Sequence, residues 1–166
     1  KLVRDVIVIK IGPCKIDNYR KTGVNLNQIE AMKMADIVNY LKPGKVYIES
    51  PDTNINKFQR FLKRMINHEH EMVLEHYADT KYMSVAAASI IAKVMRDKDI
   101  EELKEKHGEI GSGYTSDPVT IQWLENWLEN NRKFPDFVRT TWITADGMLK
   151  DKLQTRLTDW FRKLVK

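Results

Sequence analysis

Residues 45–76 read KVYIESPDTNINKFQRFLKRMINHEHEMVLEH and contain two apolar runs with a helical pattern between them. Residues 46–49 follow a Pro-Gly breaker and predict a short buried strand. Residues 72–76 predict a second strand. Apolar side chains between the two runs recur every three or four positions, which predicts an amphipathic helix: Ile55, Phe58, Phe61, Leu62, Met65 and Ile66. A strand, a helix and a strand in this order favour parallel pairing in an α/β sheet.

The alternation of strands and helices continues on both sides of this unit. Upstream, the β-branched run at residues 6–11 predicts another strand, ended by a Gly-Pro pair. Asn25 or Asn27 would cap a helix that ends before residue 43. Downstream, residues 84–106 predict a long helix, and Asp117 with the proline after it predicts the start of the next. The sequence therefore favours an α/β fold with a helical C-terminal part.

The C-terminal part predicts one more helix. From Thr144 onward, apolar residues recur at helical spacing with Lys and Arg between them: Leu149, Leu153, Leu157, Trp160, Phe161 and Leu164. Packing on its own domain is favoured for this stripe over contact with a partner. A length of 166 residues with 42% hydrophobic content fits one domain. We expect a single domain over residues 1–166, with an α/β core and loops at about 1–143 and a C-terminal helix at 144–166.

Composition narrows the classes of function. The formal net charge of +5 and the pI of about 9.2 suit an anionic partner, although many basic proteins bind no nucleic acid. Cys14 is the only cysteine, which excludes an internal disulfide and a thiolate zinc cluster and favours a reducing cytoplasm. No apolar run approaches the roughly 20 residues of a membrane helix. We therefore expect a cytoplasmic protein without a membrane segment.

Two carboxylates follow the two central strands. Glu49 comes at the end of the first strand, and Asp79 comes shortly after the second. In a parallel sheet ligands gather beyond the carboxyl ends of strands, and Mg²⁺ and Mn²⁺ prefer oxygen ligands. The pair is therefore a candidate metal site. On spacing alone, acidic residues that face water or cap the next helix are the commoner case.

Several ordered motifs together resemble one known family. Residues 78–93, ADTKYMSVAAASIIAK, together with Arg96-Asp97, resemble the signature segment of ribonuclease HII, the type 2 ribonuclease H, and especially of its archaeal members. Residues 45–50, KVYIES, resemble the strand that bears a catalytic aspartate, with the same 30-position step to Asp79. Residues 108–118, GEIGSGYTSDP, resemble the tyrosine loop, and residues 134–142 resemble the closing segment. The resemblance extends to about Gly147.

The resemblance implies a fold, an activity and a metal. The fold would be ribonuclease H-like, and the activity would be endonucleolytic hydrolysis of the RNA strand of RNA/DNA hybrids, or cleavage in duplex DNA that contains ribonucleotides, in DNA replication and repair. Asp79 matches a metal-binding catalytic aspartate. Glu49 stands at another such position, where the family usually has Asp. Both would bind Mg²⁺ or Mn²⁺, and the extra methylene of Glu49 would move its carboxylate by roughly a bond length, which favours Mn²⁺ or a slower reaction.

The resemblance also implies substrate-binding residues. Tyr114 matches a tyrosine that lies against the sugar at the cleavage junction, where a 2′-hydroxyl distinguishes RNA from DNA. Without the resemblance, a tyrosine between glycines would more often anchor a loop. Lys81 matches a lysine near the scissile region that could contact a phosphate, and its alternative is a solvated lysine at a helix start. Arg96 and Arg139 match family positions, and structural ion pairs are as good an interpretation for each.

One family element is absent from the sequence. The family carries two further acidic ligands in an Asp-Glu-Ala-Gly-Arg-Gly motif on its first strand, and no such string occurs here. We expect a fold that is incomplete at its N-terminus, a chain that self-associates through exposed strand edges, and a complete protein that is monomeric. Two-metal hydrolysis uses ions roughly 4 Å apart, which two carboxylates do not easily hold. The alternative function is a catalytically inactive nucleic-acid-binding or interaction module.

Two other polar groups compete for the role of metal ligand. Asp52 lies three residues after Glu49, and a structural role in the loop is favoured for it. His68, His70 and His76 lie among glutamates, but alternate residues of a strand point to opposite faces. A solvated edge of mixed charge is therefore the favoured interpretation of the histidines.

Overall fold

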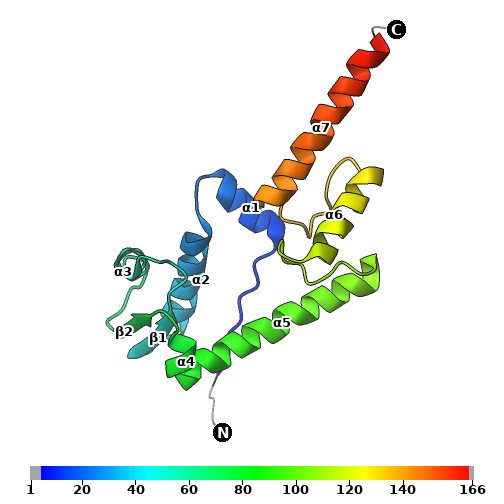
Figure 1. Ribbon diagram of the computed structural model, residues 1–166. Helices are drawn as coiled ribbons and strands as arrows, with labels where there is room; N and C mark the ends of the chain where they lie inside the picture. Colours follow the sequence, from blue (N-terminus) through cyan, green and yellow to red (C-terminus); the bar gives the residue numbers. More distant parts are fainter. Residues whose placement is uncertain (1–4, 165–166) are drawn as a thin grey trace. The chain divides into compact units, whose positions relative to one another are not determined.

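The computed structural model describes the backbone of residues 5–164 and the side chains of residues 5–154 (Figure 1). The chain divides into two compact units, one of residues 5–11 and 19–96 and the other of residues 12–18 and 97–164. The elements, in chain order, are α1 (Pro13–Lys21), α2 (Leu26–Leu41), β1 (Lys45–Glu49), α3 (Ile55–Lys63), β2 (Glu71–Glu75), α4 (Ala78–Lys81), α5 (Met83–His107), α6 (Pro118–Asn130) and α7 (Ile143–Leu164).

The first unit is built on the predicted strand–helix–strand segment. Strands β1 and β2 pair in parallel, with Lys45 opposite Glu71 and Glu49 opposite Glu75. Helix α3 connects them, and Asn54 caps it by accepting a hydrogen bond from the Lys57 backbone N–H at 2.9 Å. Helices α2 and α3 and the two strands together bury one apolar core: Ala31, Ala35, Ile48, Phe58, Leu62 and Leu74.

Helix α2 has well-formed ends. Asn25 forms a capping box with Gln28, in which each side chain accepts from the backbone N–H of the other residue. At the other end, the Asn39 side chain donates to the Met65 carbonyl at 2.8 Å and accepts from the Asn67 N–H at 3.0 Å. These two bonds tie the segment between α3 and β2 to α2.

The strand predicted at residues 6–11 is not formed. This stretch has no regular structure, and β1 and β2 form the only sheet among the described residues. A β-branched run becomes a strand only where another strand satisfies its backbone N–H and C=O groups. The apolar side chains of Val6, Val8 and Ile9 are 57%, 42% and 39% exposed. An exposed apolar run is a surface through which chains can associate, and the expected self-association stays a prediction.

The second unit is helical. Helix α5 extends from the first unit into the second, and α6 begins where predicted, with Asp117 as its N-cap and Pro118 in its first turn. The start of α7 packs on α6 in a second apolar core: Leu124, Leu128, Phe134, Val138 and Ala145. The C-terminal helix is confirmed as a backbone element. Its predicted apolar positions Leu157, Trp160, Phe161 and Leu164 lie outside the residues whose side chains are described.

Helix α1 was not predicted. One of its residues, Asp17, binds the segment around Thr140 in the second unit. The carboxylate of Asp17 is 5% exposed and accepts four hydrogen bonds, from the backbone N–H and the hydroxyl of both Thr140 and Thr141, at 2.5–3.2 Å. Burial raises the pKa of Asp17, but the four hydrogen bonds outweigh it and lower the pKa below 3.8. Asp17 therefore stays ionised at neutral pH and fixes the segment that follows Arg139.

Candidate active site

Glu49 and Glu75 end the two strands side by side. They are register partners at the carboxyl ends of β1 and β2. The residues before them, Ile48 and Leu74, are each 7% exposed and point into the core, so the alternation of a strand directs both glutamates to the other face. Both glutamates are half-buried. The predicted position of Glu49 at the sheet edge is therefore confirmed by the strand bounds, and Glu75 is an acidic neighbour that the sequence analysis did not single out.

Asp79 lies in a short turn that returns to this edge. Tyr77 adopts a left-handed conformation with φ of 56°, which turns the chain sharply after β2. The next residue, Ala78, is 1% exposed and anchors α4, which contacts β1. Asp79 follows it, half-buried. The turn therefore brings the element that bears Asp79 against the strand that ends in Glu49.

Lys81 is held by Glu75. Its Nζ donates to one carboxylate oxygen of Glu75, and the Tyr82 hydroxyl donates to the other at 3.2 Å. The Tyr82 ring lies 4.6 Å from the ring of Tyr47, two residues before Glu49. The hydrogen bond from Lys81 lowers the pKa of the Glu75 carboxyl, and the same bond raises the pKa of Lys81. This network keeps one negative and one positive charge next to the Glu49 and Asp79 positions.

Asp52 has the structural contacts that were favoured for it. Its carboxylate accepts from the Asn54 backbone N–H at 2.9 Å and from the Asn27 side chain at 3.1 Å. The first of these bonds is the main reason that its pKa is lowered. Asp52 thus fastens the loop between β1 and α3 to the start of α2.

The histidines do not form a metal cluster among the described residues. The His68 ring nitrogen Nε2 lies 3.3 Å from the Pro43 carbonyl, and His70 Nδ1 lies 2.9 Å from the His68 carbonyl. No group of three or more His, Cys, Asp or Glu residues within residues 5–154 is arranged to hold a metal ion. The histidines are therefore not a candidate metal site, and the metal-binding role of Glu49 and Asp79 stays a prediction.

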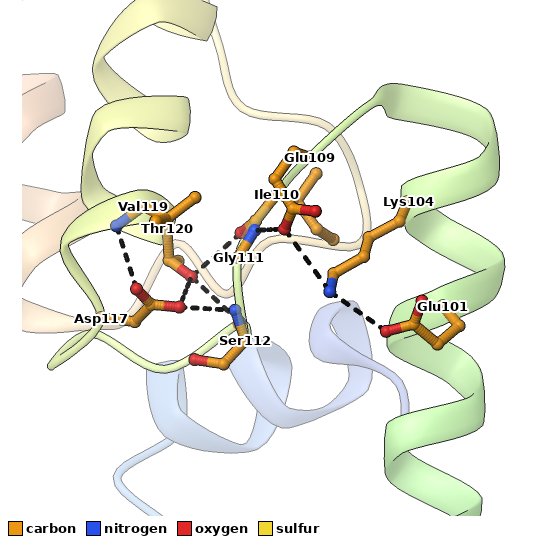
Figure 2. Close-up of polar contacts among 10 residues, drawn as sticks. Glu101, Lys104, Glu109, Ile110, Gly111, Ser112, Asp117, Val119 and Thr120 are labelled. Carbon is orange, nitrogen blue, oxygen red and sulfur yellow. Dashed lines mark hydrogen bonds and ion pairs between the residues drawn. The ribbon is translucent and has the colours of Figure 1, made fainter.

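Tyr114 sits on a tightly bonded loop in the second unit. Figure 2 shows the contacts of Ser112, Asp117 and Thr120 that order this loop. Asp117 accepts from the Ser112 N–H at 2.6 Å and from the Val119 N–H at 3.0 Å, and the first bond contributes most to lowering its pKa to about 2. The Thr120 hydroxyl donates to the Ile110 carbonyl at 3.0 Å. The Tyr114 side chain itself is 51% exposed. The loop thus presents its aromatic ring on a backbone that is already ordered.

The other side of this loop is tied to α5. Glu109 accepts from the Gly111 N–H at 2.9 Å, and its carboxylate lies 3.4 Å from Lys104 Nζ (Figure 2). Lys104 also pairs with Glu101 at 3.1 Å. Gly111 has a φ of 71°, and an added Cβ would lie 2.6 Å from oxygen atoms of Asp117 and Thr120. The close packing around Gly111 therefore requires a residue without a side chain.

Arg139 lies in the closing segment of the second unit. Its guanidinium carbon is 5.3 Å from the centre of the Trp142 ring, which is a cation–π contact. Arg139 is half-buried, and the two threonines after it are those bound by Asp17. The five predicted site residues thus divide between the two units, with Glu49, Asp79 and Lys81 in the first and Tyr114 and Arg139 in the second.

The fold matches solved structures of one class of nuclease. The chain aligns with the crystal structure of ribonuclease H2 from Pyrococcus horikoshii OT3 at a TM-score of 0.76 and 42% identity, over 85% of this chain and 66% of that one. It aligns with ribonuclease HII in the PCNA complex from Archaeoglobus fulgidus at a TM-score of 0.75 and 41% identity, over 84% and 66%. The predicted ribonuclease H-like α/β class is therefore confirmed.

The family follows from the sequence comparisons. The profile described as Ribonuclease HII matches residues 1–145. The ribonuclease HII of Pyrococcus furiosus is 39% identical over 165 residues, which cover 96% of this chain and 72% of that protein. The Pyrococcus horikoshii protein is 43% identical over 146 residues, which cover 87% and 65%. The chain belongs to the ribonuclease HII family of hydrolases, and it spans roughly two thirds to three quarters of the length of these relatives. Within its described residues, no helix has both the length and the apolar character that a membrane crossing needs.

Proposed function

We propose that this chain forms part of an endoribonuclease that hydrolyses the RNA strand of RNA/DNA hybrids, or ribonucleotides within duplex DNA, by metal-assisted phosphodiester cleavage. The observation that carries the proposal is the contact of α4, which bears Asp79, with the strand that ends in Glu49. Family membership supports the same reaction. The proposal places the enzyme in the cytoplasm as a monomer, with nucleic acid from DNA replication and repair as its substrate.

The donor atoms suit Mg²⁺ or Mn²⁺. Glu49 and Asp79 offer carboxylate oxygens, and hard divalent cations at phosphoryl-transfer sites commonly take one or two carboxylates, with water and phosphate oxygens completing the shell. A bound cation would activate a water molecule and offset the charge that develops on the phosphate. Glu75 is the register partner of Glu49, and its ion pair with Lys81 limits the repulsion between these two adjacent glutamates.

The remaining predicted residues recognise the substrate. Tyr114 has an exposed phenol on an ordered loop, so stacking against a sugar costs little additional ordering of the backbone. Its hydroxyl would sense the 2′-OH of a ribonucleotide. Lys81 is exposed, and a substrate phosphate would share the ammonium that Glu75 now holds. Arg139 would bind a phosphate through the edge of a guanidinium that rests on Trp142.

The function is tested by cleavage of end-labelled duplexes. The substrates are an RNA/DNA hybrid, a DNA duplex with one ribonucleotide, and all-DNA and all-RNA duplexes, each with Mg²⁺, Mn²⁺ or EDTA. Two proteins are assayed. One is the chain of residues 1–166, and the other is the same chain extended at its N-terminus by a strand that carries Asp-Glu-Ala-Gly-Arg-Gly. We expect the extended chain to cut the hybrid with either metal, leaving 5′-phosphate and 3′-hydroxyl ends, and to leave the all-DNA duplex intact.

The same assay separates the enzyme from its rival. A nucleic-acid-binding module without activity is favoured by one observation, the absence of a three-residue metal cluster among residues 5–154. Such a module would bind the hybrid with strong salt dependence. Binding without cleavage by the extended chain, under every metal, would reject the proposed hydrolysis and support the rival.

A further inference from the structure

A pocket of about 390 Å³ lies in the first unit between the start of α2 and helix α3. Its walls include the loop residue Asp52 and two phenylalanines of α3, of which Phe58 is 3% exposed and Phe61 is half-buried. The pocket is separate from the carboxylates of the candidate active site, since neither Glu49 nor Asp79 lines it. Asp52 is the lining residue nearest in sequence to the candidate active site, because it follows Glu49 by three residues.

Three cations of one helix face this pocket. Lys57, Arg60 and Arg64 line it, and their spacing of three and then four residues puts them on one side of α3 and the turn that follows. Asp52 is the one carboxylate in the lining, so three positive charges meet one negative charge and leave an excess of two. The Asp52 carboxylate already accepts two hydrogen bonds from Asn27 and Asn54. Among the described residues, no side-chain hydrogen bond or ion pair engages either Arg60 or Arg64.

The chemistry of the lining selects a phosphate that belongs to a larger molecule. Two guanidinium groups without partners offer paired N–H donors, which match the oxygens of a phosphate. The pocket is too large for a phosphate ion alone, and the Phe61 ring offers an apolar surface for the sugar next to it. The chain has a net charge of +5, which also favours a polyanion over a single small anion.

We propose that the Arg60–Arg64 pocket binds a backbone phosphate of the nucleic-acid substrate, at a distance from the phosphate that is cleaved. This inference rests on the proposed function, because it extends the substrate contact of the same unit beyond Glu49 and Asp79. The pocket adds affinity and fixes the direction of the duplex, and it takes no part in the bond that breaks.

The test is equilibrium binding of a fluorescent RNA/DNA hybrid, in EDTA so that cleavage does not occur. Arg60→Gln and Arg64→Gln are compared with Lys63→Gln. Lys63 is the matched control because it removes a charge from the same helix but lines a different pocket, the one beside His68 and His70. We expect each arginine variant to weaken binding by about 5–10-fold near 0.1 M salt and to reduce the slope of log Kd against log salt by about one. Lys63→Gln should change Kd by less than about twofold.

The outcomes distinguish the proposal from its neighbours. Equal effects of all three variants would mean a general charge effect and would overturn the proposed pocket. AMP and inorganic phosphate are added as competitors, and displacement of the hybrid by millimolar AMP that depends on Arg60 and Arg64 would assign the pocket to a small phosphate ester instead. Failure of the cleavage assay leaves this binding test intact, so the two proposals stand or fall separately.

Discussion

Asp79→Asn in the extended chain should lower the rate of hybrid hydrolysis on the order of 10³-fold or more. The amide has the size of the carboxylate but no charge, so the turn after β2 keeps its shape while one of the two proposed anionic ligands is lost. The turn is anchored by the buried side chain of Ala78 and not by the carboxylate of Asp79, so the Asp79→Asn variant should fold normally. The measurement is the single-turnover rate with Mg²⁺ and with Mn²⁺ at saturating enzyme.

A matched change separates this effect from a change in net charge. Asp36→Asn makes the same substitution at an exposed position of α2, where Asp36 pairs with Lys33 at 2.6 Å. That variant should keep its rate within about twofold, because surface ion pairs of this kind contribute little. A rate for Asp79→Asn above one tenth of the unsubstituted rate, with the Asp36 control unchanged, would remove Asp79 from the site.

The second large effect is on stability. Gly111→Ala should lower the free energy of unfolding of the second unit by about 3 kcal/mol or more, because a positive φ and an overlap with neighbouring atoms both oppose the methyl group. The added Cβ would meet the Asp117 carboxylate and the Thr120 hydroxyl at 2.6 Å and the Thr120 backbone nitrogen at 2.7 Å. Relief requires the loop to move away from the start of α6, which breaks the bonds that order Tyr114.

Gly108→Ala is the control for backbone strain. Gly108 also has a positive φ, of 78°, but nothing lies within 4 Å of the position of its Cβ. Gly108→Ala should therefore lower the free energy of unfolding by only about 1 kcal/mol. Denaturant unfolding followed by tryptophan fluorescence measures the stability of both variants. The signal reports on the second unit, which contains both glycines, since all four tryptophans lie between residues 123 and 160. Equal midpoints for the two variants would show that the loop is looser than its hydrogen bonds indicate.

The sequence predicted the elements whose signals are local. The strands at 45–49 and 71–75 and the helix between them follow from hydrophobic periodicity and a Pro-Gly breaker, and the structure confirms them within a few residues. The run at residues 6–11 has the same β-branched composition and is not a strand. The two central strands have each other as pairing partners, whereas residues 6–11 have no partner strand among the described residues. The presence of a partner strand cannot be predicted from the composition of the run itself.

The candidate site shows the same division. Glu49 and Asp79 are visible in the sequence because each follows a strand, whereas the role of Glu75 depends on a register that places it beside Glu49 and within reach of Lys81. Asp17 was missed because its partners, Thr140 and Thr141, lie more than 120 positions away. The sequence of a short polar helix such as α1 contains no pattern that predicts this long-range contact. The assigned roles of Tyr114 and Arg139 came from family resemblance and stay predictions.

The proposed metal site is tested by anomalous diffraction from crystals of the extended chain soaked in MnCl₂. We expect a manganese peak about 2–2.5 Å from a carboxylate oxygen of Glu49 and also from one of Asp79. The peak should be absent from crystals of the Asp79→Asn variant. A peak bound by one of these residues without the other, or two carboxylates too far apart to share an ion, would contradict it.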